Sequence, residues 1–337
     1  MQRRIYELDA LRGIAALAVV IYHFTTRYSV LYGFDEDPLF SLPLGHYGVQ
    51  LFFVVSGFVI FLSLNNCKHP ADFIVSRFAR LYPVYWAAVI ITFSTVTWFG
   101  LEGRERTVIE ALINLTMLQG FFDVPDVEGV YWTLKWELTF YFWALMIFMF
   151  NLQKYAIHAC ALLLLSQWGT VLMETYFYGV PRLVRLVFLN TYGNLFVAGV
   201  LFYLLMFGQP RPIIHILIGV SLFNQYLMHG LESFFVTVGI FTLFYLFVYE
   251  KIQFLAQKPL ILLGTISYSL YLIHEYVGWI LMRELMAAGV SSTVAVLCAI
   301  GMALTLAYFM TFKIEHPAMA KIKKVYKQKY RARFAKA

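Results

Sequence analysis

An arginine and a histidine lie eleven residues apart in one strongly apolar stretch near the start of the chain. The stretch is LDALRGIAALAVVIYHF, residues 8–24, and the two residues are Arg12 and His23. Eleven steps of about 100° return to within roughly 20° of the starting face, so both side chains share one helix face about 16 Å apart along its axis. Such side chains are costly in a bilayer and normally face a cavity or each other. Arg12 then either extends back to the membrane surface or lines the mouth of a cavity that leads to His23.

Glu137 and His274 are expected at the same depth in the membrane as His23. At about 1.5 Å per residue, predicted spans at 131–150 and 259–283 put all three about 21–22 Å from the cytoplasmic face. A histidine beside a carboxylate suits general-base chemistry, because the carboxylate fixes the imidazole tautomer and stabilises the imidazolium. The unperturbed histidine pKa of about 6.5 also suits proton transfer near neutrality. The three residues therefore predict a functional site in the outer half of the membrane.

Two of these residues also have a simpler interpretation. His23 taken alone fits a polar contact between helices. Glu137 could pair with Lys135, although residues two apart on a helix point to different sides. Lys135 and Glu275 lie close to the same predicted layer. The combination, rather than any single residue, favours a functional site.

Two arginines three residues apart precede the third predicted span. They are Arg77 and Arg80 in VSRFARLYPVYW, residues 75–86, and on a helical turn they form one fork at the cytoplasmic face. Two guanidinium groups suit a bidentate grip on phosphates. A positive-inside anchor explains this segment equally well.

Small and aromatic residues in other spans favour packing. Ser56 and Gly57 in QLFFVVSGFVIFL permit close helix approach or leave room for a thin substrate chain, and we favour packing for Gly57. Ser56 lacks the G-x-S-x-G context of a hydrolase nucleophile and is given no catalytic role. Tyr268 and Tyr271 are more typical of packing or interface residues. The sequence has no P-loop and no metal-ligand cluster, and its three cysteines form no CxxC pair.

The composition indicates a membrane protein. Hydrophobic residues make up 61% of the chain and charged residues 13%, with a mean hydropathy of +0.71, whereas soluble proteins carry about a quarter charged residues. A hydrocarbon core about 30 Å thick needs about 20 apolar residues. The ten predicted spans are 8–28, 44–64, 82–101, 131–150, 154–174, 186–208, 212–229, 231–249, 259–283 and 290–314. The shorter apolar piece at 108–122 is expected to lie at the interface or to re-enter.

Loop charges give the predicted orientation. The basic side contains both termini, the 65–81 loop and the tail KIKKVYKQKYRARFAKA, which has eight Lys or Arg. The opposite side contains the 102–130 loop, with six acidic residues against two arginines. Both termini are therefore predicted to be cytoplasmic, with no cleavable signal peptide. The tail at 321–337 is expected to contact anionic lipid rather than nucleic acid, and to follow a transmembrane domain at 1–320.

Six motifs occur in order along nearly the whole chain. They are LDALRGIAALAVVIYHF at 8–24, FFVVSGFVI at 52–60, RFARLYP at 77–83, WTLKWE at 132–137, GTISYSLYLIH at 264–274 and EHP at 315–317. Together they resemble the acyltransferase-3 family of polytopic bacterial membrane enzymes, which move acyl groups from cytoplasmic acyl-coenzyme A onto extracytoplasmic glycans. Thr133 stands where the family's W-S-L-x-x-E motif usually has Ser. The spans at 154–249 carry no motif of this family.

The resemblance implies an all-α integral membrane protein with about ten transmembrane helices around a central cavity, in the inner membrane of a bacterium. Acyl-coenzyme A, foremost acetyl-coenzyme A, would be the donor substrate, with no bound cofactor and no metal. The acceptor would be a hydroxyl of O-antigen, capsule, exopolysaccharide or a lipid-linked sugar. The chain ends at Ala337 without the fused esterase-like domain of some members, so a stand-alone member is expected.

The same resemblance implies roles for single residues. Arg77, Arg80 and Arg12 would hold the phosphates of the donor, and its pantetheine arm would reach up the cavity. His23, supported by Glu137, would either deprotonate a sugar hydroxyl or first take the acyl group as a covalent intermediate. Six further residues are expected on the cavity or acceptor side: Ser56, Trp132, Lys135, Tyr268, Tyr271 and His274.

Two other classes of protein are open from the sequence. One is a transporter or flippase for a lipid-linked saccharide, in which buried charges form a pathway, although the sequence has no internal repeat of the kind common in transporters. The other is a non-enzymatic membrane subunit or receptor, which would leave the layer of His23, Glu137 and His274 without a purpose. Thioester hydrolysis by the purified protein would separate an enzyme from both.

Overall fold

The computed structural model describes residues 5–176, 179–208 and 211–331. Residues 332–337 of the predicted tail, and residues 209–210 in the predicted break at GQPRP, lie outside these ranges. Within the described ranges every regular element is a helix, most of them α-helices and a few of them short 3₁₀ or π turns. The predicted all-α architecture is therefore confirmed.

Among the residues that the structure describes, six helical stretches are long and apolar enough to cross a bilayer, and a bent pair of helices makes a seventh if it counts as one span. The multi-pass membrane protein is confirmed, whereas the count of ten spans is not. Two predicted spans contain helices that are too short. Helix α6 (Leu134–Met149) has 16 residues and α9 (Gly193–Phe207) has 15, so they measure about 24 Å and 22 Å against a hydrocarbon core of about 30 Å.

The chain divides into two compact units, which are described separately. Unit 1 consists of Met1–Ala15, Tyr47–Pro70 and Thr133–Ile261. Unit 2 consists of Ala16–His46, Ala71–Trp132 and Leu262–Ala337.

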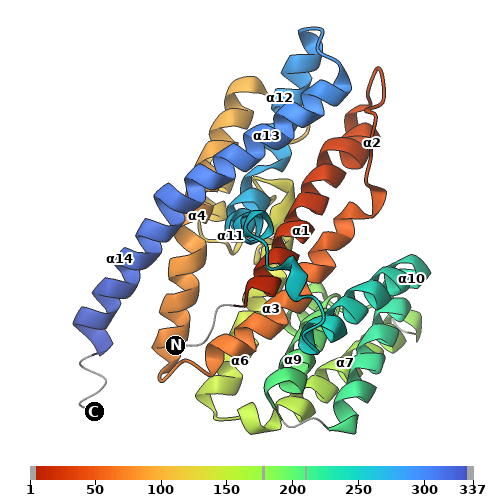
Figure 1. Ribbon diagram of the computed structural model, residues 1–337, viewed down its shortest axis with the longest axis vertical. Helices are drawn as coiled ribbons and strands as arrows, with labels where there is room; N and C mark the ends of the chain where they lie inside the picture. Colours follow the sequence, from red (N-terminus) through yellow and green to blue (C-terminus); the bar gives the residue numbers. More distant parts are fainter. Residues whose placement is uncertain (1–4, 177–178, 209–210, 332–337) are drawn as a thin grey trace. The chain divides into compact units, whose positions relative to one another are not determined.

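Unit 1 is an assembly of apolar helices (Figure 1). They are the first part of α1 (Tyr6–Tyr22), α3 (Gly48–Leu64), α6, α7 (Ala156–Tyr176), α8 (Arg182–Val187), α9 and α10 (Pro212–Val248). The backbones of α3 and α9 approach each other closely. A Cβ added at Gly57 would overlap the Phe196 carbonyl, and one added at Gly199 would overlap the Val54 carbonyl. The packing role predicted for Gly57 is confirmed, since only a residue without a side chain permits this backbone contact.

Helix α10 contains a kink at the position where the sequence predicts a break between two spans. Gly230 has φ 80° and ψ −173° there, which is not a helical conformation. Such a positive φ is readily adopted by glycine and strains most other residues. The division between 212–229 and 231–249 therefore corresponds to a real discontinuity in the helix.

Unit 2 contains the end of α1, the segment from Ala71 to Trp132 and the chain from Leu262 onward. Its further elements are the π turn η1 (His23–Arg27), α2 (Tyr28–Tyr32), α4 (Pro70–Phe99), α5 (Val108–Asn114), α11 (Lys258–Ile273), α12 (Glu275–Ala287), α13 (Ser292–Met310), the π turn η7 (Thr311–Glu315) and α14 (His316–Tyr326). Helices α12 and α13 lie side by side (Figure 1). Helix α4 begins well before the predicted span at 82–101, so Arg77 and Arg80 both lie on it.

The predicted span at 259–283 is not one straight helix, because the chain bends by 75° between α11 and α12. Side chains support the break on both sides. The His274 ring contacts the carbonyls of Leu270 and Tyr271 at the end of α11, and the backbone N–H of Tyr276 in α12 donates to a buried carboxylate. Backbone groups freed by the bend are thus satisfied. A depth for His274 that assumes a straight helix no longer applies.

The apolar piece at 108–122 is not one long helix. Its first half forms α5, which begins with a capping box between Thr107 and Glu110. The hydrogen bond from the Thr107 backbone N–H holds the pKa of the Glu110 carboxyl below its usual value. Seven residues cannot cross a bilayer, and a position at the interface stays a prediction.

Candidate active site

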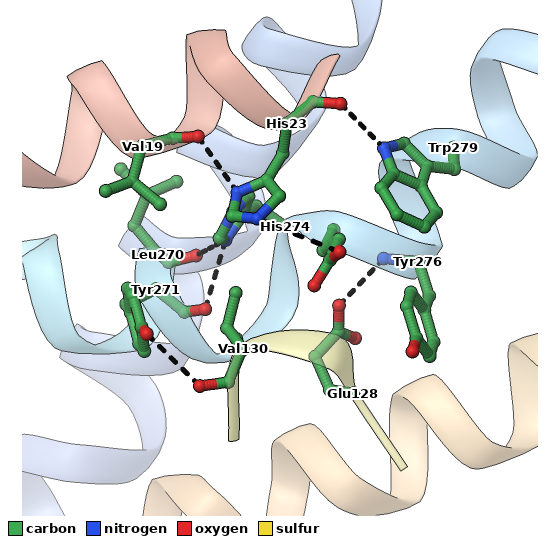
Figure 2. A network of polar contacts seen from close by, with 10 residues as sticks. Val19, His23, Glu128, Val130, Leu270, Tyr271, His274, Tyr276 and Trp279 are labelled. Atoms are coloured by element: carbon green, nitrogen blue, oxygen red, sulfur yellow. Dashed lines mark hydrogen bonds and ion pairs between the residues drawn. The ribbon is translucent and has the colours of Figure 1, made fainter. Parts of the chain in front are cut away.

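His23 begins the π turn that follows α1, and its side chain is 13% exposed. Its Nδ1 atom lies 3.0 Å from the carbonyl oxygen of Val19, one turn earlier. The same Nδ1 lies 3.0 Å from Nε2 of His274 (Figure 2). Two histidines far apart in sequence are therefore in direct contact inside unit 2. Single π turns inside α-helices often occur at functional sites.

The hydrogen bonds of His274 determine the tautomers of both rings. Nδ1 of the fully buried His274 lies 3.0 Å from the carbonyl oxygens of Leu270 and Tyr271. Because carbonyls only accept hydrogen bonds, Nδ1 must carry a proton. In the neutral ring Nε2 is then an acceptor, so it receives the Nδ1 proton of His23. This network assigns the unprotonated nitrogen of His23 to Nε2.

A carboxylate faces that unprotonated nitrogen. Oε1 of Glu275 lies 3.7 Å from Nε2 of His23, and the Glu275 side chain is 6% exposed. Its other oxygen, Oε2, is buried and has no hydrogen-bond partner. Gly129 packs so tightly on this carboxylate that a Cβ there would overlap it. Buried polar atoms without partners are rare, and active sites are one place where they occur.

A second carboxylate, Glu128, supports the start of α12. Its Oε1 accepts a hydrogen bond of 2.7 Å from the backbone N–H of Tyr276, and its Oε2 lies 2.8 Å from the hydroxyl of Thr92. Glu128 precedes the 3₁₀ turn η4 (Gly129–Thr133) and is completely buried. Burial, together with the neighbouring Glu275 carboxylate, raises the pKa of Glu128 well above its usual range.

Trp279 connects α12 to the π turn. Its indole Nε1 donates a hydrogen bond of 2.9 Å to the carbonyl oxygen of His23, and Figure 2 shows it beside this residue. The Arg104 guanidinium lies 5.6 Å from the ring centre of Tyr276 and 6.0 Å from that of Trp279. His23 is therefore held at its backbone by Trp279 and at its ring by His274. This arrangement can move a proton to and from a group placed at Nε2.

A family model described as an acyltransferase domain matches residues 5–312 of this chain. The chain belongs to this acyltransferase family. The match includes five of the six motifs, and the closing EHP at 315–317 lies just beyond its end. No solved structure matches the chain.

Several curated proteins are similar to the chain. A protein of Acidianus two-tailed virus named "Putative acetyltransferase ORF330" is 23% identical over 290 residues, which are 82% of each chain. Exopolysaccharide production protein ExoZ of Rhizobium meliloti is 32% identical over 29% of this chain and 32% of its own. "Putative peptidoglycan O-acetyltransferase YrhL" of Bacillus subtilis is 34% identical over 31% of this chain and 15% of its own. The chain therefore spans a third or less of the length of ExoZ and YrhL.

Glu137, the carboxylate predicted to support His23, lies in unit 1. Its Oε1 accepts hydrogen bonds from the Ser56 hydroxyl at 3.2 Å and from the Tyr141 hydroxyl. Ser56 is thus placed as a hydrogen-bond donor to Glu137, and its cavity or acceptor-side role stays a prediction. Because Glu137 and His23 belong to different units, their pairing stays a prediction.

The other predicted site residues make local contacts. Within unit 1, Lys135 lies 5.8 Å from the ring centre of Trp136, and Arg12 lies 3.8 Å from the carboxylate of Asp9. The site roles of both residues stay predictions. Trp132 belongs to the turn η4, and its acceptor-side role also stays a prediction.

The two predicted tyrosines bond to backbone carbonyls of unit 2. The Tyr268 hydroxyl donates to Leu81 at 3.5 Å, and the Tyr271 hydroxyl donates to Val130 at 3.1 Å. The second bond anchors the loop that carries Glu128 (Figure 2). No group of three or more His, Cys, Asp or Glu among the described residues is placed to hold a metal ion.

Sequence reasoning missed Glu128 and Trp279 and gave Glu275 no role. Glu128 lies in a loop without helical periodicity, so its burial gives no signal in the sequence. Its position four residues before the WTLKWE motif was the one available hint. Glu275 directly follows His274, and a second ionisable residue inside an apolar segment is a signal in itself.

Proposed function

We propose that the chain transfers an acyl group, foremost acetyl, from acyl-coenzyme A to a hydroxyl of an extracytoplasmic glycan. Membership of the acyltransferase family supports the reaction class. The names of ExoZ and YrhL, which refer to exopolysaccharide production and peptidoglycan O-acetylation, support a glycan acceptor. The basic loops and tail support a bacterial inner-membrane location with both termini in the cytoplasm.

One observation carries the mechanism: the contact with His274 leaves Nε2 of His23 as the unprotonated nitrogen. In direct transfer, Nε2 takes the proton of the acceptor hydroxyl as its oxygen attacks the thioester carbonyl. The carbon–sulfur bond breaks, and the thiolate leaves with the proton that His23 has taken up. In the covalent route, Nε2 itself attacks the thioester and the thiolate of coenzyme A leaves; the acyl group then passes from Nε2 to the acceptor oxygen, and the hydroxyl proton goes to the thiolate. Both routes use the same atom.

The imidazolium formed at His23 needs a carboxylate. Glu275 lies 3.7 Å from the protonated atom within unit 2, and we assign it the supporting role on that ground. Glu137 is the carboxylate that the sequence predicts for this role, and that pairing is kept as a separate proposal. The proposal places Arg77, Arg80 and Arg12 at the donor phosphates, at the cytoplasmic end of the pathway.

The test replaces His23 by Ala in the purified protein. We expect release of coenzyme A from acetyl-coenzyme A to fall to the uncatalysed background, because both routes use Nε2 of His23. His158→Ala is a matched control, since His158 is exposed on α7 in the other unit. The melting temperature of both variants in detergent should stay close to that of the wild type.

A His23→Ala protein that keeps more than a tenth of the wild-type rate would contradict the assignment. Rapid quenching followed by mass spectrometry distinguishes the two routes, because only the covalent route leaves an acetyl group on the peptide with His23. Chemical shifts of surface polysaccharide from cells with and without the protein would identify the acceptor, since O-acylation moves the ring protons.

A further inference from the structure

The C-terminal helix ends beside the start of α4 within unit 2. The hydroxyl of Tyr326, at the end of α14, donates a hydrogen bond of 3.1 Å to the carboxylate of Asp72 in the first turn of α4. Figure 1 shows that the chain enters α4 at the same end at which it leaves α14. The two helices therefore run in opposite directions where they meet.

This antiparallel contact brings Lys323 toward Arg77 and Arg80. Stepping back three residues from Tyr326 to Lys323 moves about 4.5 Å along α14, and stepping forward five residues from Asp72 to Arg77 moves about 7.5 Å the same way along α4. Lys323 is half-buried, whereas its neighbours Lys321 and Lys324 on α14 are exposed.

Four positive charges gather at this place. Arg77, Arg80 and Lys327 are each close enough to Lys323 for their charges to act on it. Asp72 provides one negative charge against these four. Like charges at close range repel, so such a cluster is stabilised when it binds an anion with several negative groups.

We infer that Lys323 joins Arg77, Arg80 and Lys327 in one binding site for a phosphate-bearing ligand. Arginine supplies a planar fork that matches a phosphate, and lysine supplies a mobile point charge, so the four side chains suit two or more phosphate groups. The inference rests on the proposed function in one respect: the donor, acyl-coenzyme A, carries a diphosphate and a further phosphate. It assigns part of the basic tail to the donor site, not to lipid alone.

An anionic lipid headgroup offers the same phosphate chemistry. The two sources reach the site by different routes: coenzyme A is water-soluble and binds from solution, whereas a lipid arrives from the bilayer. Each source therefore needs its own arm of the experiment.

The donor arm measures binding of coenzyme A to the full-length protein in detergent by isothermal titration calorimetry. Lys323→Ala should raise the Kd about tenfold or more, because a charge-assisted bond to phosphate is lost. Lys324→Ala is the matched control: it removes the same charge from the next residue, which is exposed, and should change the Kd less than twofold. Lys323→Arg should bind nearly as well as the wild type. Pantetheine, which lacks the phosphates, should bind equally to all four proteins.

The lipid arm measures the melting temperature in neutral detergent with added phosphatidylglycerol or phosphatidylcholine. If Lys323→Ala keeps full coenzyme A binding but loses the stabilisation by phosphatidylglycerol, the phosphate site stands and its ligand is lipid. If it matches the wild type in both arms, the inference is overturned.

Failure of the proposed function gives a different result. In that case the wild type binds coenzyme A through Lys323 but releases none from acetyl-coenzyme A, so binding and turnover separate the two proposals.

Discussion

Two carboxylates among the membrane helices differ in how completely they are hydrogen-bonded. In unit 1, Oε1 of Glu137 accepts bonds from the hydroxyls of Ser56 and Tyr141. In unit 2, Oε2 of Glu275 has no partner, and its Oε1 lies 3.7 Å from an imidazole nitrogen. Both bonds of Glu137 go to its Oε1, whereas Glu275 is a buried carboxylate with an open oxygen. Such a carboxylate is held by the fold at a cost of about 1–3 kcal/mol, which indicates a role other than stability.

The largest expected effect compares Glu275→Gln with Glu137→Gln. If Glu275 stabilises the imidazolium of His23, the Glu275→Gln substitution should lower kcat by a factor of about 10²–10⁴ and leave the melting temperature nearly normal. Glu137→Gln should lower kcat less than tenfold, since an amide oxygen still accepts the two hydroxyl bonds. Steady-state kinetics of coenzyme A release on both purified variants measures the difference. A larger loss for Glu137→Gln would reverse the comparison and support the pairing predicted from the sequence.

Two glycines sharpen the same contrast between packing and chemistry. In Gly57→Ala the new Cβ meets the backbone of Phe196 in unit 1, whereas in Gly129→Ala it meets the Glu275 carboxylate in unit 2. A backbone cannot move aside as a side chain can, so Gly57→Ala should destabilise the protein by about 1–3 kcal/mol. Gly129→Ala should displace Glu275, lowering kcat with a smaller change in melting temperature. Thermal melting and kinetics on one preparation of each variant test this, and equal melting temperatures would contradict it.

The smallest expected effect concerns Glu128, which caps α12. Glu128→Gln imitates the neutral acid and should keep the bonds to Tyr276 and Thr92, whereas Glu128→Ala leaves the Tyr276 N–H without its partner and should cost about 1–3 kcal/mol.

The raised pKa of Glu128 also gives a pH dependence with a definite sign. Its stabilising contribution is present below the usual carboxyl pKa of about 4.3 and is lost as pH rises through the raised value.

As the pH rises above the usual carboxyl pKa of about 4.3, the wild type should therefore lose stability relative to Glu128→Gln. Melting temperatures of both proteins across this range measure the effect. Parallel curves for the two would show that Glu128 does not titrate in this way.

The sequence predicts the parts of this molecule that depend on composition and spacing. Apolar runs locate most helices, Gly230 marks a kink, and Gly57 marks a close helix crossing. These features follow from local patterns of 3.6 residues or from small residues in apolar segments. The direct contact between His23 and His274 does not, because the predicted depth of His274 assumes a straight helix and the chain bends there.

Other features depend on long-range contacts and could not be predicted. The residues from 259 to 283 form one apolar run, so nothing local indicates the bend at His274, which is supported by Glu128 from a distant loop. The rotation of α6 that turns Glu137 toward Ser56 is set by packing and not by periodicity. Spacing alone predicts which carboxylates lie inside the membrane. It does not predict which one faces a histidine.

The break between α11 and α12 also brings two helix ends together beside His23. A helix carries about half an elementary charge at each end, negative at the C-terminus and positive at the N-terminus. The positive end of α12 lies at the Tyr276 N–H and the two carboxylates, and the negative end of α11 faces the Nδ1–H of His274. The acidic and imidazole groups therefore sit in an electric field made by the backbone itself. Because peptide dipoles bind no protons in the physiological range, this field stays constant while the side chains within it change their charge.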